Sequence, residues 1–267
     1  MDEKQLAKRQ KILAKIQEFT LMDDDFMTVF FDNDIPRTEY VLRIIMENET
    51  LSVKSVKTQY EIKNLKGRSV RLDVRAEDGS GKVYDIEIQN ADSGAGARRA
   101  RYNSALMDAD ATVPKMDTEK LPETYVIFIT ANDVLGDGFP LYHIERTIQE
   151  SRKLFNDGAH IIYVNGTYRG GKIGDLMHDF SCKKADEMKN PILAEKVRLL
   201  KENDKGVKHM CKIMEDFAKE ERAEERIETA VQILKDGKMT ETELIYYFHL
   251  SPEQMAKVKE QLEAYAI

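Results

Sequence analysis

Residues 70–89, VRLDVRAEDGSGKVYDIEIQ, alternate apolar and polar side chains on both sides of a glycine-containing turn. This period of two predicts a β-hairpin, because successive side chains of a strand point to opposite faces. Four of the polar residues need a reason, since a solvated strand would do as well with lysine, threonine or serine. They are Asp73, Asp85, Glu87 and Gln89. An exposed polar face and a metal site are both open explanations.

The turn at residues 79–81 sets the register of the hairpin. A three-residue loop places Asp78 opposite Lys82. Counting inward along both strands then places Asp73 opposite Glu87. Opposed carboxylates lie only about 5 Å apart and repel each other unless a positive charge lies between them. A divalent cation such as Mg²⁺ would supply that charge, whereas a register shifted by one residue would leave two ordinary surface charges.

The segments around the hairpin indicate the fold class. Helical periodicity predicts helices at residues 1–17, 23–34, 37–49 and 96–110. Strand patterns predict further strands at residues 51–62, 124–130 and 159–165, with a short strand at the start of 141–151. Strands flanked by helices on both sides predict an α/β (α+β) domain in which the strands up to residue 89 form a meander.

The chain beyond residue 174 is almost wholly helical in pattern. Its charged segment at residues 219–238 has Gly237 as the expected stop. Two short helices should follow, because Thr-x-x-Glu begins at Thr240 and Ser-x-x-Gln begins at Ser251, each a capping box. We therefore expect a main domain at residues 1–180 and a helical extension with a small helical hairpin at residues 181–267.

Composition limits the classes of function. The chain has 267 residues and a formal net charge of -7, so its overall charge does not favour nucleic acid. No apolar run approaches the roughly 20 residues that a membrane-spanning helix needs, and the charged first helix lacks the apolar centre of a signal peptide. We expect a soluble, cytoplasmic protein that does not enter a membrane.

Basic residues are concentrated in one segment, residues 52–75, which carries seven basic and two acidic side chains. The basic residues are Lys54, Lys57, Lys63, Lys66, Arg68, Arg71 and Arg75. A solvated strand face and a surface facing phosphate both explain this basic segment.

A second phosphate signal is weaker. The segment GTYRGGKIGDL at residues 166–176 contains Gly-x4-Gly-Lys, but Ile173 follows the lysine where a phosphate-binding loop needs serine or threonine. We expect these glycines to form a turn before a helix that starts near Ile173.

The cysteines and histidines do not predict a zinc site. Cys182 and Cys211 have no paired spacing, and we expect both to be buried or inert. His178 and Cys182 lie four residues apart on one helical face. Two ligands without a third more often indicate packing than metal binding.

The motifs resemble a known family. Asp73, the glycine-rich hairpin and the Glu87-Ile88-Gln89 triplet resemble the core of the PD-(D/E)xK nuclease superfamily, with Gln89 where lysine is most common. Arg99 and Tyr102 also resemble the Arg-x-x-Tyr that follows the ExQ motif in one branch. This branch is that of the recombination-promoting nucleases, or PD-(D/E)xK family transposases.

A third element is similar to the same branch, since Asp23 and Phe26 match its N-terminal Asp-x-x-Phe. The resemblance covers roughly residues 20–180. It implies a restriction-endonuclease-like αβββαβ core with a mixed central sheet flanked by helices, plus a helical C-terminal extension.

The resemblance implies a metal-dependent deoxyribonuclease that hydrolyses DNA phosphodiester bonds and is linked to recombination or mobile elements. Asp73 and Glu87 would ligate Mg²⁺ or Mn²⁺, with the backbone carbonyl of Ile88 as a third ligand. Gln89 would orient the attacking water or hydrogen-bond the phosphate. The implied DNA-binding residues are Arg98, Arg99, Arg101 and Tyr102, and Asp23 would be an accessory acidic residue.

Gln89 is the departure from the common motif. An amide is always neutral, so it can position a water or phosphate but cannot offer the charge of a lysine. Slow cleavage and a catalytically silent DNA- or protein-binding module on the same fold are both open. Many enzymes of this class act as homodimers, which makes the helical extension a candidate dimer element by resemblance alone.

Overall fold

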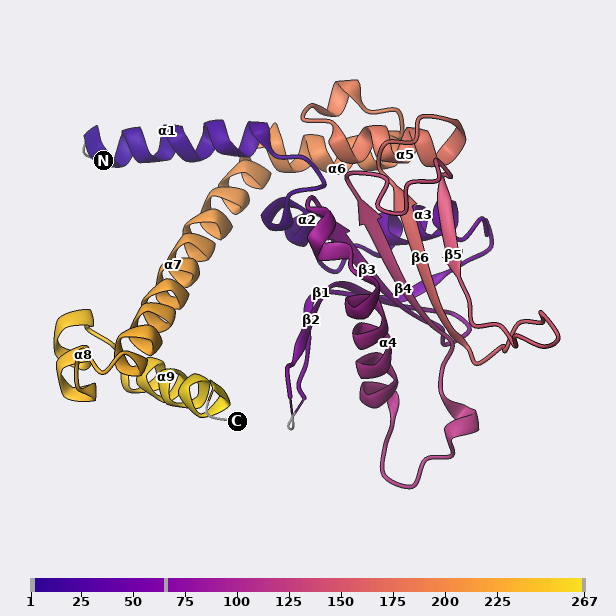
Figure 1. Ribbon diagram of the computed structural model, residues 1–267. Coiled ribbons are helices and arrows are strands. Elements are labelled where there is room, and N and C mark those ends of the chain that lie inside the picture. Colours follow the sequence, from indigo (N-terminus) through magenta and orange to yellow (C-terminus); the bar gives the residue numbers. More distant parts are fainter. Residues whose placement is uncertain (1–2, 65–66, 266–267) are drawn as a thin grey trace. The chain divides into compact units, whose positions relative to one another are not determined.

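The computed structural model describes residues 3–64 and 67–265 (Figure 1). The chain forms two compact units, Met1–Met210 and Cys211–Ile267. Leu65 and Lys66 of the expected turn after the first strand lie outside the described residues, as do the first two residues of the first expected helix. Within the described part of the chain, no helix is long and apolar enough to cross a membrane.

The first unit contains a sheet and its covering helices. Its α-helices are α1 (Glu3–Glu18), α2 (Asp24–Phe31), α3 (Ile35–Ile45), α4 (Ala97–Ala111), α5 (Gly171–Ser181) and α6 (Pro191–Lys201). Its 3₁₀ helices are η1 (Asp92–Ala95), η2 (Thr118–Lys120) and η3 (Ala185–Glu187). Its strands are β1 (Val53–Ile62), β2 (Val70–Asp78), β3 (Val83–Gln89), β4 (Thr124–Thr130), β5 (Leu141–Ile144) and β6 (Ala159–Asn165).

The six strands form one mixed sheet in the order β1-β2-β3-β4-β6-β5. Strands β1 to β3 are an antiparallel meander, β3, β4 and β6 are parallel, and β5 is antiparallel to β6. Helix α4 connects β3 to β4, so the expected αβββαβ order is present and the predicted fold class is confirmed. Every residue of β4 is buried, as the apolar run TYVIFIT indicates for an interior strand.

Helix α4 packs on the sheet at the parallel strands (Figure 1). Ala100 and Met107 of α4 belong to the same buried cluster as Val126, Phe128 and Tyr163 of β4 and β6. Helices α2 and α3 lie against β1, and α3 also contacts α5. The helix that carries the predicted arginines is therefore fixed to the sheet by its apolar residues.

Short local signals set the ends of several helices. Pro36 separates α2 from α3 by standing in the first turn of α3, where its missing N–H costs no hydrogen bond. Asp34 is the N-cap of α3 and accepts a hydrogen bond from the Arg37 N–H at 3.1 Å. The turn expected after β6 is present, and α5 begins at Gly171, two residues before the expected start.

A buried lysine ties α6 to the N-terminal helices. Lys201 is 3% exposed, and its ammonium donates to the backbone carbonyls of Gln17, Phe19 and Lys183. The ammonium also lies 5.1 Å from the ring centre of Phe26 in α2. The carbonyl oxygens replace the water that would otherwise solvate the charge, and the contacts hold the junction between α1 and α2 in place.

The second unit has its own small core. Its helices are the C-terminal part of α7 (Asp204–Lys235), α8 (Glu241–Phe248) and α9 (Pro252–Tyr265). Gly237 ends α7 with a φ of 65°, and the capping box of Thr240 with Glu243 begins α8, as expected. Apolar side chains from the three helices and from the connection between α8 and α9 form the buried core of Ile227, Ala230, Val231, Leu244, Leu250, Met255 and Val258.

Candidate functional site: a carboxylate cluster beneath helix α4

The β2–β3 hairpin has the predicted register. Val74 pairs with Ile86 and Arg75 pairs with Asp85, so the next pair in the same register is Asp73 with Glu87. The backbone N–H of Ile88 donates to Asp73 Oδ2 at 2.9 Å, which joins the two strands at this point. The two carboxylates therefore share one face of the sheet.

The exposed polar face considered for β3 is wrong for its two acidic residues. Asp85 and Glu87 are both 0% exposed, because they lie on the face that α4 covers. Their neighbours in the parallel register are Val126 and Phe128, so the carboxylates lie in apolar surroundings. Burying a carboxylate in this way favours its neutral form unless it gains a partner.

Burial raises the pKa of all three carboxyl groups in the cluster. The pKa of Asp73 rises to about 7, first because of burial and second because of the charge of Glu87. Burial also raises the pKa of Glu87, although Arg99 opposes this. The pKa of Asp85 lies well above its ordinary value because of burial and the neighbouring Glu87. The three carboxyl groups therefore keep their protons to higher pH than solvated carboxyl groups do.

Asn103 connects the two fully buried acids. Its side-chain amide donates to Asp85 Oδ2 at 3.0 Å and to Glu87 Oε1 at 3.2 Å. The other oxygen of Asp85, Oδ1, is buried and has no hydrogen-bond partner as a carboxylate. A neutral Asp85 resolves this, because its carboxyl proton can then be donated to Glu87.

Gln89 contacts both opposed carboxylates. Its amide Nε2 lies 3.5 Å from Asp73 Oδ2 and 3.4 Å from Glu87 Oε2. Its Oε1 accepts from Arg99 Nη1 at 3.4 Å, and Arg99 Nη2 forms an ion pair with Glu87. Gly94 lies directly against this amide, since a Cβ at Gly94 would be 2.0 Å from Gln89 Oε1. The amide thus makes long contacts with two acids and one arginine, and Gly94 leaves the space that it occupies.

A cleft of about 1580 Å³ opens beside these groups. Asp73, Ile88, Gln89 and Asn103 are among its lining residues. Five arginines also line it, namely Arg68, Arg71, Arg98, Arg99 and Arg101. The acidic lining residues are Asp24, Glu61 and Asp73, so the cleft is more basic than the chain as a whole.

The basic segment divides between two environments. Arg68 and Arg71 border the cleft, which fits a surface that faces phosphate. Arg75 and Lys57 instead pack over the ring of Tyr60, at 5.0 and 5.6 Å from its centre. Only part of the segment is therefore directed to the site.

Tyr102 lines the cleft but its hydroxyl is already engaged. It donates to the backbone carbonyl of Arg68 and accepts from Asn64 Nδ2 at 3.1 Å. These bonds attach α4 to the loop between β1 and β2. Arg98 and Arg101, by contrast, are exposed on α4 where the helix borders the cleft.

The acidic residue of α2 that reaches the cleft is Asp24. Asp23 is the N-cap of α2, and its Oδ2 accepts from the backbone N–H and the hydroxyl of Thr20 at 2.7 and 2.8 Å. Asp24 lines the cleft and accepts from Gln59 Nε2 at 3.1 Å. Its negative charge also acts on Asp73, whose pKa it helps to raise.

The structure adds four residues that were not among the predicted site residues: Asp24, Asp85, Gly94 and Asn103. Asp85 had a sequence signal, because it lies two residues before Glu87 on the same strand face. Asn103 had one as well, since it follows Arg99 by four residues on the same helical face. Neither Asp24 nor Gly94 had a pattern that distinguishes it from its neighbours.

The comparison with protein families gives a match. Residues 39–167 match the family model described as PD-(D/E)XK nuclease family transposase. The matched segment includes α4 and the whole β2–β3 hairpin, so it contains the carboxylate cluster. No curated protein and no solved structure gives a significant match.

Proposed function

We propose, from the premise that residues 39–167 match a PD-(D/E)XK nuclease family transposase, that this protein is a divalent-metal-dependent DNA endonuclease. The match supports a nuclease-type function. The observation that carries the metal dependence is the pairing of Asp73 with Glu87 beside a cleft lined by five arginines. A role in recombination or mobile elements rests on the family description.

The donor set fits Mg²⁺ or Mn²⁺. Asp73, Asp85 and Glu87 present carboxylate oxygens, the ligands that these hard cations prefer, while among the described residues Arg99 forms the ion pair with this cluster. The raised pKa values of Asp73 and Glu87 are what a site with missing positive charge should have. Asp73 and Glu87 would hold the cation, with the Ile88 carbonyl as a third ligand.

A divalent cation bound there would lower the pKa of a water and offset charge on the phosphate during hydrolysis. The chain's own groups have separate tasks. Gln89 orients a water or a phosphate oxygen with its amide, because it can donate and accept but cannot take a proton. Arg98 and Arg101 neutralise phosphate at the edge of the cleft, and Asn103 holds Glu87 in place from α4.

The test is plasmid cleavage with Mg²⁺ or Mn²⁺ by the wild type, Glu87→Gln and the matched control Glu77→Gln. Glu77 lies on β2 outside the cleft lining, so its substitution removes a carboxylate from the same hairpin without touching the site. Glu87→Gln should lose roughly a hundredfold or more in rate, the loss expected when charge stabilisation is removed. Cleavage by Glu87→Gln at the wild-type rate would show that the site is elsewhere.

The second candidate is a silent DNA-binding module on the same fold. Two observations favour it, namely the neutral amide of Gln89 and the ion pair that Arg99 makes with Glu87. If the wild type binds DNA but cuts no DNA form with any divalent metal, this candidate replaces the nuclease. Thermal unfolding of each variant shows whether a loss of cleavage comes from a loss of fold.

A further inference from the structure

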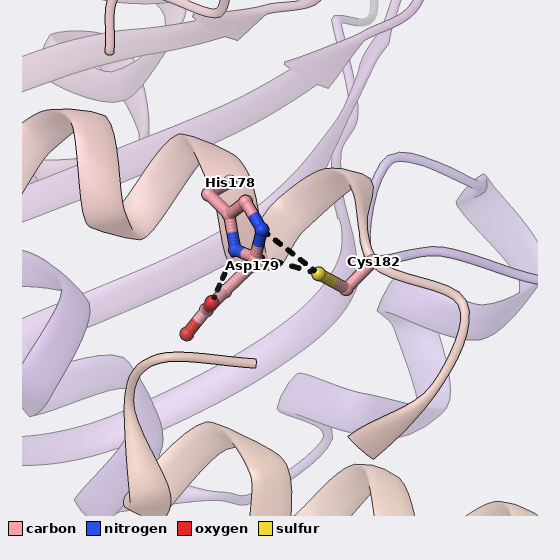
Figure 2. Close-up of side chains that lie close together, drawn as sticks. All are labelled: His178, Asp179 and Cys182. Atoms are coloured by element: carbon pink, nitrogen blue, oxygen red, sulfur yellow. Dashed lines mark hydrogen bonds and ion pairs between the residues drawn. The ribbon is translucent and has the colours of Figure 1, made fainter. Parts of the chain in front are cut away.

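A second group of ligand-type side chains lies on α5, apart from the carboxylate cluster. Figure 2 shows His178, Asp179 and Cys182 turned toward one another at the C-terminal end of this helix. One ligand atom from each residue lies within 4.8 Å of the others. The sequence offered two ligands four residues apart, and the fold adds Asp179 as the third.

We propose that His178, Asp179 and Cys182 bind a zinc ion, with water at the fourth position. A thiolate, an imidazole and a carboxylate are a ligand set that suits Zn²⁺ and is too soft for Mg²⁺. The site is separate from the proposed nuclease site in both residues and ligand chemistry. It therefore stands or falls independently of the nuclease function.

The ligand atoms lie at about the spacing of tetrahedral zinc, but they do not yet point at one centre. His178 Nδ1 lies 3.2 Å from Asp179 Oδ1 and 3.5 Å from Cys182 Sγ, and the same sulfur lies 3.9 Å from Nε2. Zinc bonds of about 2.0–2.1 Å to nitrogen or oxygen and about 2.3 Å to sulfur place tetrahedral ligand atoms about 3.3–3.6 Å apart. The sulfur therefore lies beside the ring, and the imidazole must turn for Nδ1 to share a cation with Cys182.

The two contacts of His178 Nδ1 compete with each other. This nitrogen faces Asp179 Oδ1 and Cys182 Sγ at once, although one ring nitrogen carries either one proton or one lone pair. A cation between the three atoms would use the Nδ1 lone pair and leave the proton on Nε2.

Asp179 is fixed in a position to act as a ligand. It is 0% exposed, and it accepts from the backbone N–H groups of Lys189 and Asn190 at 2.7 and 2.8 Å. The bond from Lys189 uses only one lone pair of Oδ1, so the other can face a cation. Because Asn190 is the N-cap of α6, zinc binding would join the end of α5 to the start of α6.

The charges also balance. Binding of the cation displaces one proton from Cys182, which goes to solvent, and the resulting thiolate and the Asp179 carboxylate together offset the charge of Zn²⁺. His178 is about one-third exposed, which leaves a side open for the water ligand.

Cobalt substitution tests the site directly, because a cobalt–thiolate bond gives a charge-transfer band that carboxylate ligands do not give. The wild type with Co²⁺ should show this band, and Cys182→Ser should lose it. Cys211→Ser is the matched control that keeps the band, since Cys211 is the other cysteine and is only half-buried. Glu87→Gln should also keep it, which separates this site from the proposed nuclease site.

Zinc content gives a second readout. The wild type should retain one zinc per chain after dialysis, and His178→Gln should retain roughly tenfold less at the same free zinc concentration. Saturating zinc should raise the wild-type Tm by about 5 °C and leave that of His178→Gln unchanged. No thiolate band in the wild type, a band that persists in Cys182→Ser, or full zinc retention by His178→Gln would each overturn the proposal. Because the His178 side chain is partly exposed, His178→Gln decides the matter if Cys182→Ser does not fold.

Discussion

At the scale of single residues, the main feature of the site is the repulsion between carboxylates that lie close together. Asp73 and Glu87 oppose each other across the hairpin, and Asp85 lies on the same strand face as Glu87. This repulsion and the burial of the groups raise the pKa of Asp73 and of Asp85, and Arg99 offsets part of the repulsion by its ion pair with Glu87. A cation at this site would bind more tightly as pH rises, because each carboxylate must be ionised to ligate it.

This gives a prediction for stability against pH. The pKa of Asp73 is raised from 3.8 to about 7, so the folded state holds a proton that the unfolded state has lost within that window. The folded state should therefore lose stability as pH rises from about 4 to about 7, by up to about 1.4 kcal/mol per pH unit from this group. Urea unfolding of the metal-free protein should show the decrease, and Asp73→Asn should make it shallower, while Asp85 and Glu87, whose pKa values are also raised, keep the rest.

Saturating Mg²⁺ provides the control for that measurement. It should raise the free energy of unfolding more at about pH 8 than at about pH 5, because protons compete with the cation in acid. An unfolding free energy that rises for both proteins across this window, with no difference between wild type and Asp73→Asn, would contradict the raised pKa.

Gln89→Lys is the second prediction at this scale. An ammonium group in place of the amide would lie near both Asp73 and Glu87, which the amide contacts now. It would add the charge that the common form of the motif carries, so the cleavage rate should stay the same or rise, by up to roughly tenfold. Steady-state cleavage of a fluorescent duplex checks this. Complete loss of activity would mean that the amide positions water in a way that lysine cannot.

At the scale of elements, the site depends on a helix laid over a strand. Residues two apart on β3, Asp85 and Glu87, face residues four apart on α4, Arg99 and Asn103. The apolar residues of α4 set this alignment by packing on β4 and β6. The packing of α4 therefore sets these polar contacts. Burial of the surrounding apolar surface offsets the free energy lost when the polar groups are removed from water.

The neutral state of Asp85 gives a prediction for this layer. Asp85→Asn keeps an uncharged polar group that can accept from Asn103 and donate to Glu87, so at neutral pH it should change the unfolding free energy by less than about 1 kcal/mol. Asn103→Leu removes the donor to both acids and should cost about 2–3 kcal/mol. Urea unfolding of both variants checks this. A larger loss for Asp85→Asn than for Asn103→Leu would mean that Asp85 is ionised.

At the scale of the whole molecule, the charge along one cleft differs from the net charge of the chain. The chain carries a formal charge of -7, yet five arginines line one cleft. Acidic surface elsewhere should weaken long-range attraction to DNA, while the arginines act within the screening distance of about 10 Å. Binding should therefore depend strongly on salt and on contact with this cleft.

The salt dependence of DNA binding measures those contacts. Arg98→Gln with Arg101→Gln should lower the slope of log affinity against log salt by about 2, because each lost phosphate contact lowers it by about 1. Arg198→Gln is the control, since Arg198 pairs with Asp186 on another part of the first unit and should leave the slope unchanged. Equal slopes for the double variant and the wild type would remove these arginines from the DNA interface.

The sequence by itself determined the strands, the hairpin register and the fold class. A period of two marks strands without any long-range information, and a three-residue turn fixes which residues pair, so the opposition of Asp73 and Glu87 followed from local geometry. The capping boxes at Thr240 and Ser251 likewise predicted the starts of two helices from local sequence, because a capping box involves only residues three apart.

Only the tertiary structure decided which of those residues are buried and what they touch. Asp85 and Glu87 became fully buried because α4 covers that face, and no pattern within β3 states which helix will lie on it. The contact of Gly94 with Gln89, the position of Asp24 in the cleft lining and the addition of Asp179 to His178 and Cys182 have the same origin. Each depends on the direction of a side chain relative to segments distant in sequence, which packing fixes and local periodicity does not.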